Sequence, residues 1–291
     1  IHTLVSKAST STGIRFVPAA TGFTPQGVDL GSPSFSMLKK PEVLLLVGNG
    51  VTSYDAGEVW HLLDQRYDMA ITMMESDEFD NNAINRYNTI VLVNGFYNDI
   101  GDLNRLKSWI RQGGTLIVMR NAVSWAKSKG LANVNYKRAK KKNKTKKSRP
   151  YNQLSADRGA QFIGGAIFET QLDLTHPLCY GYQQNRLPVF RRGTLFLEKG
   201  NTPYSTPVRY TANPLLSGYI ADANLQLLKS SATVIVTGMG SGKVIAMTDN
   251  PNFRAFWYGT NRLFANAIFF GHTINGRSTE SAPPPMKDKK E

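Results

Sequence analysis

The chain has 291 residues, of which 41% are hydrophobic, and it holds a single cysteine, Cys179. This length allows one large core or two modest ones, while one cysteine excludes an internal disulfide and a thiolate metal cluster. The net charge of +14 suggests a polyanion-binding protein, but its distribution along the chain argues against a basic surface throughout.

Nine of the positive charges lie in residues 137–149, and the rest of the chain carries only about +5. A block of like charges repels itself and buries little apolar surface, so we expect a solvated loop. Two interpretations stay open: a tether for nucleic acid, anionic lipid or lipopolysaccharide, or an insertion that the fold tolerates.

Residues 1–40 are rich in serine, threonine and glycine and predict an N-terminal linker or edge strands. The apolar segments 14–17 and 35–38 are the candidate strands. The chain opens with Ile1 and shows no signal-peptide pattern, so we expect it to be a segment of a longer protein. No apolar run approaches the roughly 18 residues of a membrane span.

From Pro41, short apolar runs alternate with helical patterns and glycine turns. This alternation predicts βαβ units, and therefore a parallel sheet with helices on both faces. We expect a flavodoxin-like, doubly wound α/β fold over residues 41–274, with strands at 43–47, 69–74, 89–93 and 115–119 and helices around 55–63 and 103–110.

Beyond the basic loop the pattern indicates a β-rich insertion, with strands at 162–170, 194–197, 233–237 and 243–247. A long helix is expected over 253–268, with Asp249–Asn252 as its cap and first turn. The composition of residues 275–291 predicts a disordered tail.

The turn after the fourth predicted strand is where α/β hydrolases and amidotransferases place a nucleophile. Here the turn offers Arg120, Asn121 and Ala122, none of which can attack a carbonyl carbon. Cys179 lies in an irregular segment and is expected to be a buried apolar side chain, and Ser124 lies beyond the turn. We therefore predict no catalytic residue.

Ligands of doubly wound sheets bind beyond the carboxyl ends of the strands. Backbone amides at a helix start, together with an arginine, could hold a carboxylate or another anion there, and the segment 249–254 is expected at the same rim. In the alternative interpretation the glycines only make tight turns. The candidate ligand-binding residues are Gly48, Asn49, Gly50, Ser53, Asn94, Gly95, Arg120, Asn121 and Arg254.

Several strings carry a family resemblance: Asn94–Gly95, 109–116 and 240–245 resemble class I glutamine amidotransferase-like domains. The strings 53–64, 173–178 and 249–257 resemble more closely the C-terminal domain of Bacteroidetes-type zinc carboxypeptidase-like proteins. The resemblance implies an accessory domain at an extracytoplasmic location (periplasmic, outer-membrane-associated or secreted). A zinc-binding peptidase-like domain of the same polypeptide would precede it as its partner.

That peptidase family binds zinc through His-x-x-Glu and a distant histidine, and His2, His61, His176 and His272 do not fit this pattern. His61 with Asp64 comes nearest, but two ligands do not make a zinc site. We expect no metal and no cofactor in this segment. The function that we predict is a non-catalytic accessory domain; the alternatives are an anion-binding module at the strand ends and polyanion binding through the basic loop.

Overall fold

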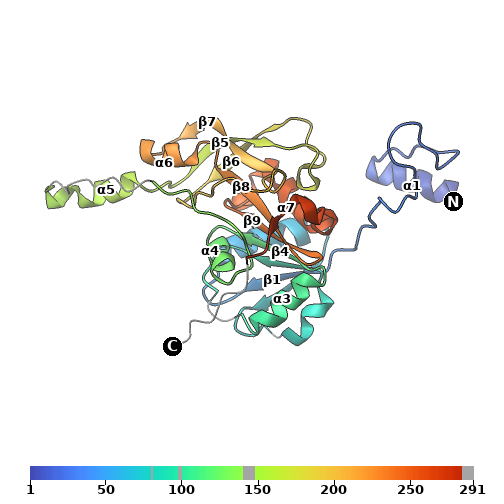
Figure 1. Cartoon of the computed structure of the whole chain (residues 1–291), viewed down its shortest axis with the longest axis horizontal. Helices are drawn as coiled ribbons and strands as arrows, with labels where there is room; N and C mark the ends of the chain where they lie inside the picture. Colours follow the sequence, from blue (N-terminus) through green and yellow to red (C-terminus); the bar gives the residue numbers. More distant parts are fainter. Residues whose placement is uncertain (80, 98–99, 140–147, 284–291) are drawn as a thin grey trace. The chain divides into compact units, whose positions relative to one another are not determined.

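The computed structural model describes residues 1–79, 81–97, 100–139 and 148–283, and the chain divides into two units after Leu38 (Figure 1). The first unit, Ile1–Leu38, contains helix α1 (His2–Thr12) followed by loops. The edge strands predicted at 14–17 and 35–38 are wrong: no strand pairs with these residues, and the side chains of Ile14 and Phe35 are exposed.

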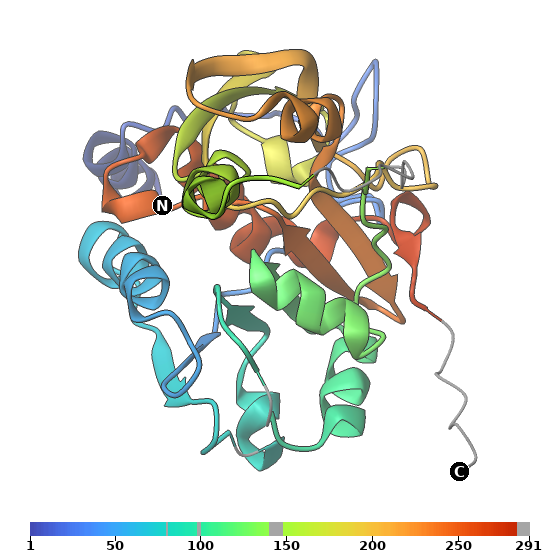
Figure 2. The same ribbon diagram turned by 90° about the vertical axis from the view of Figure 1, so that its left-hand side faces the viewer.

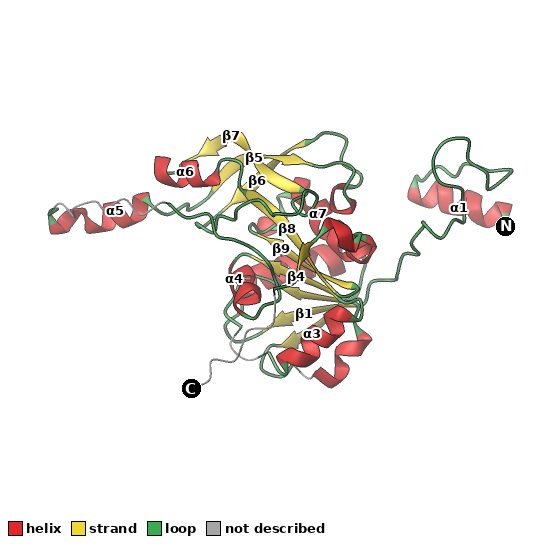
Figure 3. Cartoon of the chain, viewed as in Figure 1, coloured by secondary structure: helices red, strands yellow, loops and turns green. Residues whose placement is uncertain are grey.

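The second unit, Lys39–Glu291, is built on one sheet, whose strands are yellow in Figure 3. The strand order is β2-β1-β3-β4-β9-β8-β7-β5-β6, and β10 pairs with β8. The pairs among β1, β2, β3, β4 and β9 are parallel, and those that join β5 to β9 through β7 and β8 are antiparallel. The strands are β1 (Val43–Val47), β2 (Thr72–Glu75), β3 (Thr89–Leu92), β4 (Thr115–Met119), β5 (Ala166–Leu172), β6 (Arg186–Arg191), β7 (Val208–Gly218), β8 (Ala232–Met239), β9 (Gly242–Met247) and β10 (Glu280–Ser281).

Helices cover both faces of the parallel part of this sheet, as Figure 2 shows for α2 in light blue and for α3 and α4 in green. Alternate residues of the strands point to opposite faces of the sheet and contribute to two hydrophobic cores. Leu45 packs in one core with α2 and α7, and Leu44 packs in the other with α3 and α4. The helices of this unit are α2 (Ser53–Trp60), α3 (Leu103–Arg111), α4 (Asn121–Ser128), α5 (Leu154–Ala160), α6 (Asp222–Leu228) and α7 (Asn261–Phe270).

This arrangement confirms the predicted doubly wound, flavodoxin-like fold with a mainly parallel central sheet. The β-rich segment extends the same sheet through the antiparallel strands β5, β6 and β7. The strand expected at 194–197 is reduced to isolated bridges from Leu197 to Tyr136 and Ala232.

The long helix expected over 253–268 is broken, and only α7 from Asn261 is regular. Arg254 and Ala255 have φ angles of 50° and 54°, which a right-handed helix cannot contain. Asp249 does not cap the helix; its carboxylate accepts a hydrogen bond of 2.7 Å from the buried Arg191.

The tail predicted to be disordered from residue 275 is ordered at least as far as Pro283, and residues 284–291 lie outside the described ranges. Glu280 in β10 is 3% exposed, and its carboxylate accepts hydrogen bonds from Ser205 Oγ at 2.6 Å and from the Thr202 amide at 2.7 Å. A buried carboxylate with matched donors fixes the segment, a contact that composition alone does not indicate.

Candidate ligand cleft at the strand carboxyl ends

The turn from β4 into α4 has a strained backbone. Arg120 adopts φ 52° and ψ −119°, and its amide donates a hydrogen bond of 2.8 Å to the Met247 carbonyl. A non-glycine residue in such a conformation costs on the order of 1–3 kcal/mol and persists only where its surroundings hold it. The backbone of Arg120 is therefore held in one conformation, which fixes the point from which its side chain projects.

The Arg120 side chain lies against Asp55, which projects from the first turn of α2. Its Nη1 is 3.2 Å from Asp55 Oδ1, and the side chains are 23% and 9% exposed. A charge-assisted contact in this partly buried setting is stronger than one at the surface. The pair joins the β4–α4 bend to α2.

The loop after β9 joins the same network. Asn250 Nδ2 donates a hydrogen bond of 2.7 Å to Asp55 Oδ1 and another to Glu58 Oε2, and Glu58 Oε1 accepts one of 2.6 Å from the Arg254 amide. Burial raises the pKa of Glu58, while the bonds from Arg254 and Asn250 oppose the rise. Three separate chain segments thus meet through two carboxylates.

Asp55, Glu58, Arg120 and Arg254 line a cleft with a volume of about 960 Å³, and Asn250 lies behind them in the network. Its size is within the range of small-molecule sites. The lining residues are Thr52, Ser53, Tyr54, Asp55, Gly57, Glu58, Trp60, His61, Asn94, Arg120, Arg192, Phe253, Arg254 and Ala255.

Four of the nine predicted residues, Ser53, Asn94, Arg120 and Arg254, line this cleft. The other five, Gly48, Asn49, Gly50, Gly95 and Asn121, are not among the lining residues.

The glycines of these loops allow neighbouring backbone segments to lie close together. A Cβ at Gly50, where φ is 80°, would lie 2.6 Å from the Phe96 carbonyl oxygen, and Gly95 forms a β-bridge with Val51. The Asn94 side chain then connects the loops: Nδ2 donates to Thr52 Oγ1 at 2.8 Å, and Oδ1 accepts from the Asn121 amide at 3.3 Å.

Sequence reasoning did not single out Asp55, Glu58, Asn250 and Arg192 as site residues. Asp55 and Glu58 were interpreted as the start of a helix, and Asp55 in fact lies inside α2, whose N-cap is Thr52. For Asn250, the sequence did offer an indication: segment 249–254 follows a predicted strand, just as the 120–122 turn does.

The outer part of the cleft combines cations with aromatic rings. Arg192 and Arg254 are exposed, and no carboxylate within the described ranges forms an ion pair with either guanidinium. Phe253 stacks on Phe190 with ring centroids 3.7 Å apart, and Tyr54 is 84% exposed. Such a rim offers positive charge and flat apolar surface to a ligand.

The side chains considered as nucleophiles lie elsewhere. Cys179 is completely buried, and burial raises the pKa of its thiol to about 12. Ser124 is half-buried in α4 and does not line the cleft. Among the residues that the structure describes, no group of three or more histidine, cysteine, aspartate or glutamate side chains could hold a metal ion.

Most of the basic segment, residues 140–147, lies outside the described ranges. At its two ends the charges are engaged: Lys137 Nζ donates a hydrogen bond of 2.6 Å to the Lys229 carbonyl, and Arg149 is 3.1 Å from Asp157. None of the described helices is both long and apolar enough to cross a bilayer.

No protein-family model matches the chain, and no curated protein sequence is significantly similar to it. Among solved structures, a protein of Parabacteroides merdae described as ThuA-like aligns with a TM-score of 0.52 at 12% identity, covering 83% of this chain and 100% of that one.

Two further solved structures align at lower scores. A Bacteroides uniformis protein, also described as ThuA-like, gives 0.47 at 10% identity, covering 84% and 94% of the two chains. A Thermoplasma acidophilum protein described as one of the subunits of GMP synthase gives 0.46 at 11% identity, covering 79% and 94%. The alignment with the Parabacteroides merdae protein agrees with the flavodoxin-like α/β fold that the strand order shows.

Proposed function

We propose that the second unit is a non-catalytic accessory domain of amidotransferase-like fold that binds its ligand or partner through the strand-end cleft. The side chain of residue 120 carries this proposal. The bend that presents a nucleophile in enzymes presents a guanidinium here, and that guanidinium is paired with Asp55. The pair makes the bend a structural junction between α2, α4 and the 249–254 loop.

Ser53 is the hydroxyl in the cleft that most needs testing, because it lies at the first position of α2. Within the described ranges no hydrogen bond connects it to a histidine or carboxylate that would remove its proton. Assays of the purified chain for glutaminase, esterase and carboxypeptidase activity should give only background rates. Turnover that disappears in Ser53→Ala, Ser124→Ala or Cys179→Ala would overturn the proposal.

A second candidate function, binding of a carboxylate or similar anion, is favoured by Arg192 and Arg254. Both guanidinium groups face a cleft whose two carboxylates already accept hydrogen bonds from inside the domain. A panel of carboxylates should raise the melting temperature of the wild type but not of the Arg192→Met, Arg254→Met double variant. Arg158→Met, an exposed site on α5, is the matched control, and an equal response in all three proteins would exclude this function.

The resemblance of strings 53–64, 173–178 and 249–257 leads us to propose that the partner is a zinc carboxypeptidase-like domain of the same polypeptide at an extracytoplasmic location. The test is the coding region upstream of Ile1, which should encode His-x-x-Glu and a distant histidine. Cell fractionation should place the full protein outside the cytoplasm. An upstream region without a peptidase-like domain would remove this part of the proposal.

Polyanion binding through residues 137–149 stays a separate proposal, supported by the nine positive charges of that segment. If this segment binds polyanions, the chain should bind heparin or nucleic acid with an affinity that falls steeply as the salt concentration rises. Deletion of 138–148 should abolish that affinity, and unchanged binding would exclude the loop as the cause.

A further inference from the structure

A second hollow, with a volume of about 430 Å³, lies between α3, the β8–β9 turn and the segment around β10. It is separate from the strand-end cleft, since the two share no lining residue. We call it the α3–β10 groove. Its lining residues are Asn104, Lys107, Arg111, Gly130, Gly238, Met239, Gly240, Gly276, Thr279, Ser281, Ala282 and Pro283.

Close backbone contacts fix the walls of the α3–β10 groove. A Cβ at Gly240 would lie 2.5 Å from the Arg111 carbonyl oxygen, and one at Gly238 would lie 2.3 Å from Thr279 Oγ1. The Ser241 amide also donates a hydrogen bond of 2.9 Å to the Arg111 carbonyl. The turn therefore lies tightly against α3, and the β10 segment lies tightly against β8. A larger residue at either glycine would force the neighbouring segments apart.

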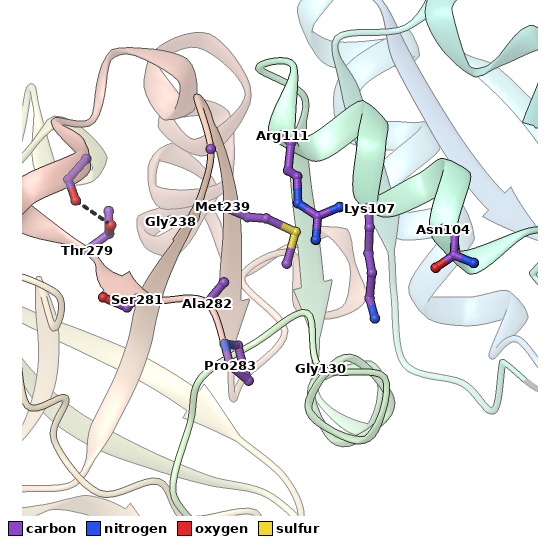
Figure 4. Close-up of a pocket in the computed structure, with 12 residues that line it drawn as sticks. Asn104, Lys107, Arg111, Gly130, Gly238, Met239, Thr279, Ser281, Ala282 and Pro283 are labelled. Carbon is purple, nitrogen blue, oxygen red and sulfur yellow. Dashed lines mark hydrogen bonds between the residues drawn. The ribbon is translucent and has the colours of Figure 1, made fainter. Parts of the chain in front are cut away.

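Two cations extend from one side of α3 into the groove, as Figure 4 shows for Lys107 and Arg111. They are four residues apart in the helix, so they lie on the same face. The Lys107 ammonium lies beside Gly130, where an added Cβ would be 3.9 Å from Nζ.

No carboxylate lines the groove, and within the described ranges neither cation takes part in an ion pair. Glu280, which precedes the lining residue Ser281, is 3% exposed and already accepts hydrogen bonds from Ser205 and Thr202. Among the residues that the structure describes, the groove is therefore lined by two positive charges and by no carboxylate.

From this arrangement we infer that the α3–β10 groove binds a phosphate group. A guanidinium fork and an ammonium point charge are the side chains that bind phosphate most strongly, and two cations match the charge of a phosphate, about −1.5 to −2 at pH 7. The Asn104 amide and the Ser281 hydroxyl add hydrogen-bonding groups at the rim. The volume leaves room for an organic substituent, so the phosphate can be free or a phosphomonoester.

The competing explanation is that these cations only stabilise the C-terminus of α3, which ends at Arg111. Positive side chains in a last helical turn interact favourably with the helix dipole. This explanation predicts a loss of thermal stability in variants and no specific response to phosphate.

The test is titration of the purified chain with inorganic phosphate, glycerol 3-phosphate and succinate at constant ionic strength, followed through the backbone amide signals of Gly130, Gly238 and Gly240. Saturable shifts with either phosphate are expected, and the comparison of the two shows whether the free anion or an ester is preferred. Lys107→Met and Arg111→Met should each weaken binding about tenfold. Lys199→Met, an exposed residue outside the groove, removes the same charge and should leave the affinity within about twofold.

Absence of saturable shifts would overturn the inference, and so would unchanged affinity in Lys107→Met and Arg111→Met. Succinate binding as tightly as the phosphates would also overturn the assignment of the ligand. Thermal melts of each variant show that it is folded, so a lost response can be assigned to the groove. None of these outcomes depends on the strand-end cleft.

Discussion

Arg120 Nη1 and Asp55 Oδ1 lie 3.2 Å apart, which joins the bend after β4 to the first turn of α2. Asn250 holds the same carboxylate from the loop after β9. One aspartate thus connects segments that are 65 and 195 residues away in the chain. The bend at which α/β hydrolases carry a nucleophile thus carries an ion-paired arginine in this chain.

Removal of Arg120 should destabilise the second unit, because Asp55 would lose its cationic partner while 9% exposed. We expect Arg120→Ala to lower the free energy of unfolding by about 2 kcal/mol, less than for a fully buried pair because the arginine keeps some contact with water. Urea unfolding followed by circular dichroism measures this. Lys40→Ala, which breaks the exposed pair with Glu42, is the control and should change stability by less than about 0.5 kcal/mol. Equal effects would contradict the role of the buried pair.

The titration of Glu58 should contribute to the pH dependence of the free energy of unfolding. Burial raises its pKa above the ordinary 4.5, so the folded state holds this proton more tightly than the unfolded state. The resulting stabilisation is complete below pH 4.5 and is lost as the pH rises through the folded-state pKa. Glu58→Gln removes this titration. The stability of the variant relative to the wild type should therefore rise between pH 4 and neutrality, as measured by urea unfolding. A difference that is constant with pH, or that falls, would contradict the raised pKa.

Cys179 should be chemically inert in the folded protein. Its thiol is buried and its pKa is raised to about 12, so almost no thiolate exists at neutral pH to attack a disulfide reagent. Reaction with Ellman's reagent should give no product in the native chain and one equivalent in urea. Rapid labelling of the native protein would show that the thiol is accessible and would reopen its role as a nucleophile.

The β10 segment should contribute to stability through Glu280. Replacement by alanine removes the acceptor of the Thr202 amide and leaves the Ser205 hydroxyl with only the Thr202 carbonyl as acceptor, at a cost of about 2 kcal/mol. Ser281→Ala, at the exposed neighbouring position, is the matched control and should cost less than about 0.5 kcal/mol. Thermal unfolding measures both. A chain that tolerates Glu280→Ala as well as it tolerates Ser281→Ala would show that the tail segment is not anchored by this carboxylate.

Local patterns were enough to predict the parallel half of the fold. The apolar runs that became β1, β3 and β4 are buried on both faces, and such runs are recognised from sequence alone. The prediction failed where distant side chains decide the structure. Asp249 was interpreted as a helix cap, but its carboxylate pairs with Arg191, which comes from β6.

The candidate site was predicted only in part for the same reason. Its location followed from strand ends, and Arg120 was recognised because it follows a strand directly. Asp55 and Glu58 have the sequence pattern of an ordinary helix start, and only the tertiary fold brings Asn250 to them. The ordered segment 275–283 includes the contact of Glu280 with Ser205, which spans 75 residues and which no local pattern records.

The most direct test of the central claim is covalent trapping at the cleft. The folded chain would be incubated with a glutamine-derived chloroketone and with a fluorophosphonate, and its intact mass would be measured. Because an arginine paired with Asp55 occupies the bend, we predict an unmodified mass under conditions that label an active amidotransferase or serine hydrolase. A stoichiometric adduct on a residue of the cleft, formed by the native chain and not by the unfolded one, would contradict the account.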